Sequence, residues 1–119
     1  MRFKVGSLLK MFSEDIGIDL GTANTLVVVK NKGIVLNEPS VVAVNTKTNK
    51  IVEVGNKAKL MIGKTPDSIQ AIRPLKNGVI ADYEMTEKML REFYKIVLKR
   101  NVLTNPKVVI CVPAGVTQV

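Results

Sequence analysis

The chain has 119 residues, 46% of them hydrophobic and 24% charged, which is typical of one globular domain rather than a disordered segment. It contains no histidine and a single cysteine, Cys111, which excludes an internal disulfide, zinc sites of the usual Cys and His kind, and Ser-His or Cys-His nucleophile pairs. Eighteen Lys and Arg against ten Asp and Glu give a formal net charge of +8. Because aromatic residues are scarce and do not alternate with the charges, we interpret this excess as a solvated basic surface and expect no nucleic-acid site.

Residues 1–13 are predicted to form a basic amphipathic segment. On a helical projection the basic side chains lie off an apolar stripe that consists of Met1, Val5, Leu8, Leu9 and Phe12. A helix of this kind can lie in a membrane interface. A frayed terminus, or a stripe packed on the body of the protein, is the alternative.

Residues 16–54 are rich in β-branched side chains and turn signals. Strands are predicted at residues 16–20, 25–30, 33–36, 40–44 and 51–54. The tripeptide at residues 31–33, Asn-Lys-Gly, is typical of a hairpin turn. The first half of the chain is therefore predicted to be a meander of β-strands.

The second half alternates helices with extended segments. Helices are expected at residues 55–62 and 86–99, an extended stretch at 70–73 and a loop at 76–78. The longer helix has one apolar face, made of Met85, Met89, Leu90, Phe93, Ile96 and Val97, and two i,i+4 ion pairs, Glu84–Lys88 and Glu87–Arg91. Residues 107–112 form an apolar strand, of the kind found in sheets covered on both faces.

The segment at residues 19–25 (DLGTANT) has the chemistry of a phosphate-binding turn. It follows a buried strand, and Gly21, Thr22 and Ala23 are small enough for their backbone N–H groups to approach an anion. Asp19 suits such a site if Mg²⁺ and its waters lie between the carboxylate and the phosphate. Taken alone, the segment could equally be a hairpin turn capped by an aspartate.

Residues 16–25 (IGIDLGTANT) resemble the first phosphate motif of the actin, Hsp70 and sugar-kinase superfamily, and within it the MreB family of bacterial actins. Further stretches resemble that family in the same order: residues 32–43 (KGIVLNEPSVVA), 54–58 (VGNKA), 61–66 (MIGKTP), 71–83 (AIRPLKNGVIADY) and 112–117 (VPAGVT). The resemblance covers residues 15–117. It implies the N-terminal part of an actin-like (ribonuclease-H-like) α/β domain, at residues 14–119, with a mixed sheet, flanking helices and a small outer subdomain inserted at about residues 33–72.

The resemblance also implies a function. Proteins of this family bind ATP with Mg²⁺ between two domains, polymerise on the inner face of the cell membrane and direct cell-wall synthesis. By position, Gly21, Thr22, Ala23 and Asn24 would contact the ATP phosphates, and Asp19 would hold the metal through water. The filament itself, the membrane and the cell-wall elongation proteins are the implied partners.

Several functional motifs of the family have no counterpart in this sequence. The catalytic Glu, the second phosphate loop and the adenosine pocket of the family are expected beyond the position of Val119, so we expect weak or no ATPase activity from this polypeptide. A fragment, a truncated reading frame and a degenerate copy are all compatible with that.

Besides Val5, Leu8, Leu9 and Phe12, a second candidate membrane contact is the pair Val102 and Leu103, for which ordinary packing under a loop is the alternative.

Two other functional hypotheses stay open at this point. One is another ATPase or a sugar kinase of the same superfamily, which would share the phosphate motif but add a substrate pocket. The other is a non-catalytic module that binds a membrane or a protein partner. Residues 37–40 and 72–74 resemble the MreB family more than sugar kinases or Hsp70 proteins.

Overall fold

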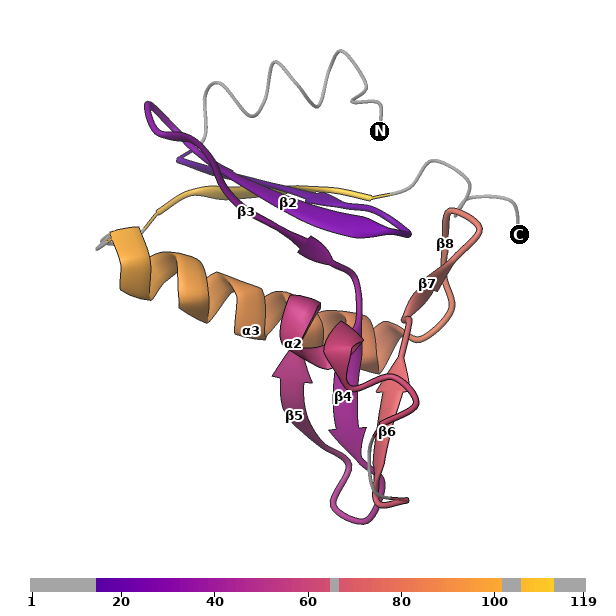
Figure 1. Ribbon diagram of the computed structural model, residues 1–119. Coiled ribbons are helices and arrows are strands. Elements are labelled where there is room, and N and C mark those ends of the chain that lie inside the picture. Colours follow the sequence, from indigo (N-terminus) through magenta and orange to yellow (C-terminus); the bar gives the residue numbers. More distant parts are fainter. Residues whose placement is uncertain (1–14, 65–66, 102–105, 113–119) are drawn as a thin grey trace.

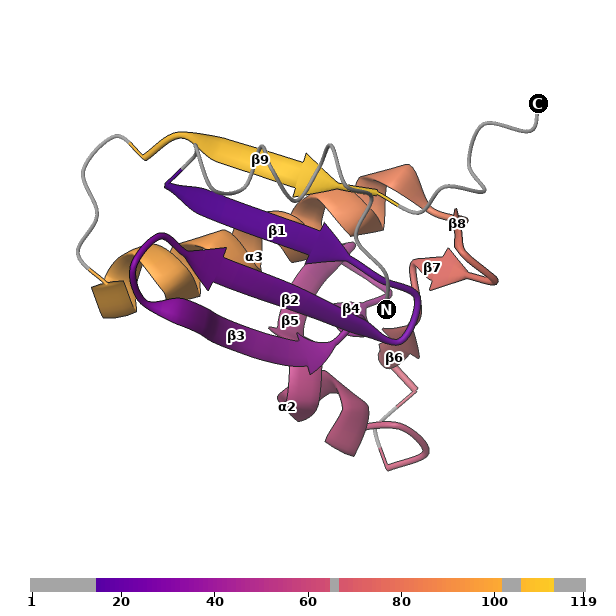
Figure 2. The ribbon, with the colours of Figure 1, turned by 90° about the horizontal axis from the view of Figure 1, so that it is seen from above.

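The computed structural model describes residues 15–64, 67–101 and 106–112. They form a four-stranded sheet, a three-stranded sheet, a small hairpin and two helices. Figure 1 shows the long helix α3 (Tyr83–Asn101) and the three-stranded sheet on the same side of the four-stranded sheet. Seen from above in Figure 2, the four-stranded sheet lies over both. This mixed α/β arrangement confirms the predicted fold class.

The four-stranded sheet carries the candidate phosphate motif. Its strands, in spatial order, are β3 (Gly33–Pro39), β2 (Asn24–Val29), β1 (Ile16–Leu20) and β9 (Val108–Cys111). β1 is antiparallel to β2 and parallel to β9, and all of its residues are buried. At the predicted hairpin turn, Asn31 and Gly33 have φ angles of 68° and 79°, a left-handed conformation that asparagine and glycine tolerate.

The three-stranded sheet starts where the chain leaves β3. Its strands, in spatial order, are β5 (Lys50–Val54), β4 (Val42–Asn45) and β6 (Ile69–Ile72). Ala58 of the short helix α2 (Gly55–Leu60) packs against Ala43 of this sheet and against Val41, which directly precedes β4. The prediction of one meander through the first half is therefore wrong. A tight turn, in which the N–H of Val41 donates to the carbonyl of Pro39 at 2.9 Å, redirects the chain into a second sheet.

A small hairpin connects the second sheet to α3. It consists of β7 (Leu75–Lys76) and β8 (Val79–Ile80), where only a loop was predicted. Strands this short show no periodicity, so the sequence pattern gives no signal for them. The hairpin turn contains Asn77 and Gly78, with φ angles of 53° and 74°.

Helix α3 begins at Tyr83 rather than at residue 86, because Asp82 caps it. The Asp82 carboxylate accepts a hydrogen bond from the backbone N–H of Met85 at 3.0 Å, which satisfies one of the free donors at the helix start. The predicted apolar face is confirmed: its fully buried side chains are Met85, Met89, Phe93 and Val97. Both predicted ion pairs are present, at 3.0 Å for Glu84–Lys88 and 2.9 Å for Glu87–Arg91. Neither of the described helices is both long and apolar enough to cross a membrane.

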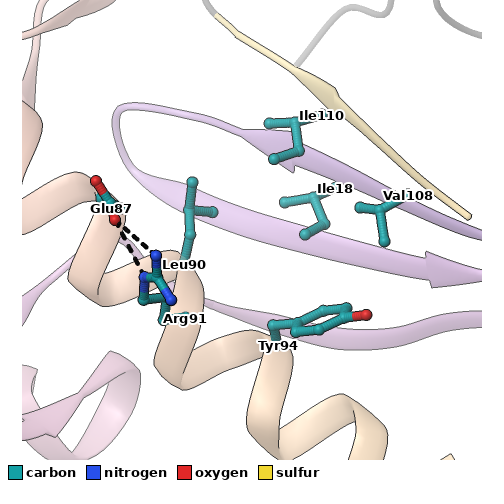
Figure 3. Close-up of a pocket in the computed structure, with 7 residues that line it drawn as sticks. All are labelled: Ile18, Glu87, Leu90, Arg91, Tyr94, Val108 and Ile110. Carbon is teal, nitrogen blue, oxygen red and sulfur yellow. Dashed lines mark hydrogen bonds and ion pairs between the residues drawn. The ribbon is translucent and has the colours of Figure 1, made fainter. Parts of the chain in front are cut away.

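The last strand has the apolar residues of a strand covered on both faces, but in the described part of the chain it is not fully covered. Val108, Ile110 and Val112 are 38%, 46% and 54% exposed, and only Val109 of this strand is buried. β9 is the outer strand of the described sheet, and α3 does not reach across it. The result is an apolar groove of about 390 Å³ between α3 and β9, shown in Figure 3, with a lining of Ile18, Glu87, Leu90, Arg91, Tyr94, Val108 and Ile110.

Candidate phosphate-binding site

The candidate loop, residues 21–23, lies between β1 and β2, at the carboxyl end of β1. Because β9 runs parallel to β1, the loop lies at the edge where the carboxyl ends of parallel strands meet, the usual place for ligands in open α/β sheets. The N–H of Gly21 donates to the carbonyl of Asn24 at 3.1 Å and closes the turn. The predicted residues Asp19, Gly21, Thr22, Ala23 and Asn24 are thus brought together within one turn and the strand end before it.

Asp19 is a buried carboxylate that lacks a full set of partners. Its side chain is 6% exposed, and within the described part of the chain its Oδ2 atom has no hydrogen-bond partner. Burial raises the pKa of this carboxyl above its usual value of 3.8, because the charged form loses its hydration. A buried polar atom without a partner is rare in native structures and is often explained by an ion or a water. Asp19 therefore has the properties of a group that binds a cation or its water shell.

The backbone of Thr22 and Ala23 provides free donors. Among the described residues, no acceptor is found for the N–H of either residue, and Ala23 is exposed. The Thr22 hydroxyl oxygen accepts a hydrogen bond from the N–H of Gly78 at 2.8 Å, which leaves the hydroxyl hydrogen for another acceptor. Small residues with outward N–H groups are the arrangement that binds phosphate oxygens.

The side chain of Asn24 has a partner in the next strand. Its Nδ2 atom donates to Oδ1 of Asn37 at 3.0 Å, and the second amide hydrogen is left for a ligand. Asn37 was part of a motif that carried the family resemblance, but no role was predicted for it. The contact fixes the direction of the Asn24 amide at the rim of the loop.

Two further residues that hold the loop were missed by sequence reasoning. Ser40 contacts it from the end of β3, and Gly78 contacts it from the β7–β8 hairpin. Both lie in motifs that resemble the family, which was the available signal. Their contacts join residues distant in sequence, so no local pattern predicts them.

Glu38 holds the neighbouring helix rather than the loop. Its Oε1 atom accepts a hydrogen bond from the backbone N–H of Asn56 at 2.9 Å, at the start of α2. Gly55 has a φ of 66°, and a Cβ atom at this position would collide with the carboxylate of Glu38. This contact fixes α2 against β3.

We expect Gly55→Ala to lower the free energy of unfolding by more than about 2 kcal/mol, because the left-handed conformation alone costs about 1–2 kcal/mol for a residue with a Cβ and the collision adds to it. Gly33→Ala is the matched control: φ is 79°, but a Cβ would meet nothing within 4 Å. Urea unfolding followed by circular dichroism measures both. Equal losses in the two variants would show that the Glu38 contact contributes nothing.

Several predicted groups lie outside the described residues. These are the candidate membrane contacts Val5, Leu8, Leu9, Phe12, Val102 and Leu103. The groove in Figure 3 contains none of the loop residues, and its lining is apolar apart from the Tyr94 side chain and the Glu87–Arg91 ion pair, in which the arginine is already paired with a carboxylate.

The sheet with its strand-end loop and the second sheet beside it define an N-terminal part of an actin-like domain. A model of the family described as MreB/Mbl protein matches residues 13–119, and the chain therefore belongs to the MreB/Mbl family. The predicted family is confirmed.

Relatives and solved structures agree with this assignment. The cell shape-determining protein Mbl of Bacillus cereus is 55% identical over 109 residues, which is 92% of this chain and 33% of that protein. The cell shape-determining protein MreB of Pasteurella multocida is 57% identical over 114 residues, or 92% of this chain and 32% of that one. A crystal structure of MreB5 of Spiroplasma citri bound to ADP is similar with a TM-score of 0.71 and 41% identity, covering 87% of this chain and 30% of that one. The chain thus spans about a third of the length of these relatives.

Proposed function

We propose that this chain is the part of an MreB-type actin-like protein that binds the phosphates of ATP together with Mg²⁺. The observation that carries the proposal is the loop itself: within the described residues the N–H groups of Thr22 and Ala23 have no acceptor, and they lie next to the buried Asp19 carboxylate, whose Oδ2 atom has no partner there either. Solved structures of MreB5 of Spiroplasma citri bound to ADP and to AMPPNP, at 41% and 40% identity, support a nucleotide as the ligand.

The residues of the loop fit the two parts of this ligand. Gly21, Thr22, Ala23 and Asn24 would hold phosphate oxygens through N–H, hydroxyl and amide groups. Asp19 would hold Mg²⁺ through water, because Mg²⁺ gives up its waters reluctantly and keeps several of them when it binds a carboxylate and phosphate oxygens. Bound Mg²⁺ would neutralise phosphate charge, and it would supply the partner that the Asp19 carboxylate lacks.

At the level of the cell, we propose that the protein forms membrane-associated filaments that direct cell-wall synthesis and maintain rod shape. The names of the relatives from Bacillus cereus and Pasteurella multocida, which describe them as cell shape-determining, support this part. The net charge of +8 is compatible with an anionic membrane surface on the cytoplasmic side. The apolar stripe with Val5, Leu8, Leu9 and Phe12, and the pair Val102 and Leu103, are the proposed contacts.

Co-sedimentation tests the assembly and membrane parts of the proposal. With Mg·ATP and vesicles that contain anionic lipid, the chain is expected to sediment with the vesicles. A variant with Leu8, Leu9 and Phe12 changed to Gln is expected to lose most of that binding, because each buried apolar side chain contributes about 1.5–3 kcal/mol. Sedimentation of the chain with Mg·ATP in the absence of vesicles would indicate that it forms filaments. Equal vesicle binding by both proteins would exclude the N-terminal stripe as the anchor, and phosphorylation of a sugar by the chain would favour a kinase.

A further inference from the structure

The hydroxyl groups of Thr25 and Ser40 form a buried hydrogen-bond chain that ends on the phosphate-binding loop. Thr25 Oγ1 lies 2.9 Å from Ser40 Oγ, and Ser40 Oγ donates to the backbone carbonyl of Gly21 at 2.7 Å. Both side chains are fully buried, at 0% exposure. A serine hydroxyl has one hydrogen, and in this case Gly21 receives it. Thr25 is therefore the donor to Ser40, and the chain runs from Thr25 through Ser40 to Gly21.

Ser40 holds the loop at a second point through its own backbone. Its N–H donates to the carbonyl of Ala23 at 2.9 Å. The carbonyl groups of Gly21 and Ala23 thus both point toward Ser40. In a planar trans peptide the following N–H points in the opposite direction. The N–H groups of Thr22 and Asn24 are therefore turned away from Ser40.

The side chain of Ser40 controls one of these two peptide groups. Without its hydroxyl, the carbonyl of Gly21 would lose this buried partner. Glycine has more backbone freedom than other residues, so the peptide between Gly21 and Thr22 could then rotate to find another donor. Such a rotation would turn the N–H of Thr22 out of the direction in which it can reach a ligand.

We propose that Ser40 is a positioning residue for anion binding, which aims the N–H of Thr22 at the phosphate. This inference rests on the proposed nucleotide site, but it makes a separate claim about the ligand-free loop. Thr25 supports Ser40 by donating to its oxygen, and its removal is expected to have the smaller effect, because Ser40 would keep its bond to Gly21.

The test compares Ser40→Ala with Thr86→Val in the full chain. Thr86 is the control because it is 4% exposed and its hydroxyl also donates to a backbone carbonyl, that of Asp82 at 2.7 Å, at the start of α3 rather than in the loop. Thr86→Val is expected to lose less stability than Ser40→Ala, because the carbonyl of Asp82 keeps the N–H of Thr86 as a donor at 3.0 Å. Amide NMR titration with Mg·ATP is expected to show about tenfold weaker binding for Ser40→Ala alone, the effect of one buried hydrogen bond. The chemical shift of the Thr22 amide is also expected to differ between ligand-free Ser40→Ala and the ligand-free wild type.

Two more variants keep the inference testable if Ser40→Ala does not fold. Thr25→Ser retains the hydroxyl and is expected to bind within about twofold of the wild type, whereas Thr25→Val is expected to show a loss smaller than about tenfold. The inference would be overturned if the Thr22 amide kept its wild-type chemical shift in both Ser40→Ala and Thr25→Val. It would also be overturned if Ser40→Ala bound nucleotide as tightly as Thr86→Val does. If the wild type does not bind Mg·ATP, the proposed function fails, and the Thr22 signal of the ligand-free variants still decides the role of Ser40.

Discussion

The Asp19→Asn variant is expected to be more stable than the wild type without ligand, yet to bind Mg·ATP about 10–100-fold more weakly. The stability gain, about 1 kcal/mol, comes from removing a buried charge whose Oδ2 atom has no hydrogen-bond partner among the described residues. The loss of binding follows because a residue that holds a metal through its outer shell typically contributes 10–100-fold to metal affinity. Urea unfolding and nucleotide titration with and without Mg²⁺ measure the two effects.

The gain in stability should depend on pH in a defined direction. Burial raises the pKa of the folded Asp19 carboxyl above 3.8, so the folded state holds this proton more tightly than the unfolded state does. The wild type therefore loses stability, relative to Asp19→Asn, as the pH rises from 3.8 through the raised pKa. Below 3.8 the carboxyl is protonated in both states, and the two proteins should differ less.

Asp67→Asn is the matched control for Asp19, since Asp67 is an exposed carboxylate away from the loop. The Asp67→Asn variant is expected to have a free energy of unfolding within about 0.5 kcal/mol of the wild type. The effect of Mg²⁺ on its nucleotide binding is expected to be the same as in the wild type. An Asp19→Asn protein that still binds Mg·ATP as tightly as the Asp67→Asn control would contradict the assigned role of Asp19.

Phe93→Ala is expected to have the largest effect on the fold, a loss of about 3–5 kcal/mol in the free energy of unfolding. Phe93 is fully buried at 0% exposure, and it lies on the face of α3 that packs in the main core. A small domain has a total stability of about 5–15 kcal/mol, so the variant should be close to unfolding at room temperature. Urea unfolding followed by circular dichroism measures the loss.

Tyr83→Ala, in the first turn of the same helix, is the control for Phe93. Tyr83 is 68% exposed, so its truncation is expected to change the stability by less than about 0.5 kcal/mol. A Phe93→Ala protein as stable as Tyr83→Ala would show that α3 does not pack on the sheet as described.

The sequence predicts the elements that have a local signal. β1 and the loop after it follow from an apolar run that ends in small and polar residues, and α3 follows from its regular apolar face and its ion pairs. The branch into a second sheet after Pro39 has no local signal, because the turn at Val41 is surrounded by uniformly β-rich residues; only the family resemblance implied a separate outer subdomain there, at about residues 33–72. The exposure of β9 depends on how far α3 reaches, which is a tertiary property.

The candidate site was predicted in part. Asp19 and residues 21–24 form one turn because they are consecutive in the sequence. The contacts that shape this turn come from Asn37, Ser40 and Gly78, and they depend on how β3 and the β7–β8 hairpin pack around the loop. The sequence therefore predicts which groups would meet a ligand, but not which groups orient them.

The most direct measurement of the central claim is an amide NMR titration of the wild-type chain with ATP, in the presence of Mg²⁺ and again with the metal removed by chelation. We expect saturable shifts that are largest at the N–H groups of Thr22 and Ala23, and weaker binding without Mg²⁺. The method registers weak binding as well as tight binding. Shifts confined to the groove at Leu90 and Tyr94, or none at the loop at saturating Mg·ATP, would contradict the assignment of this loop as the phosphate site.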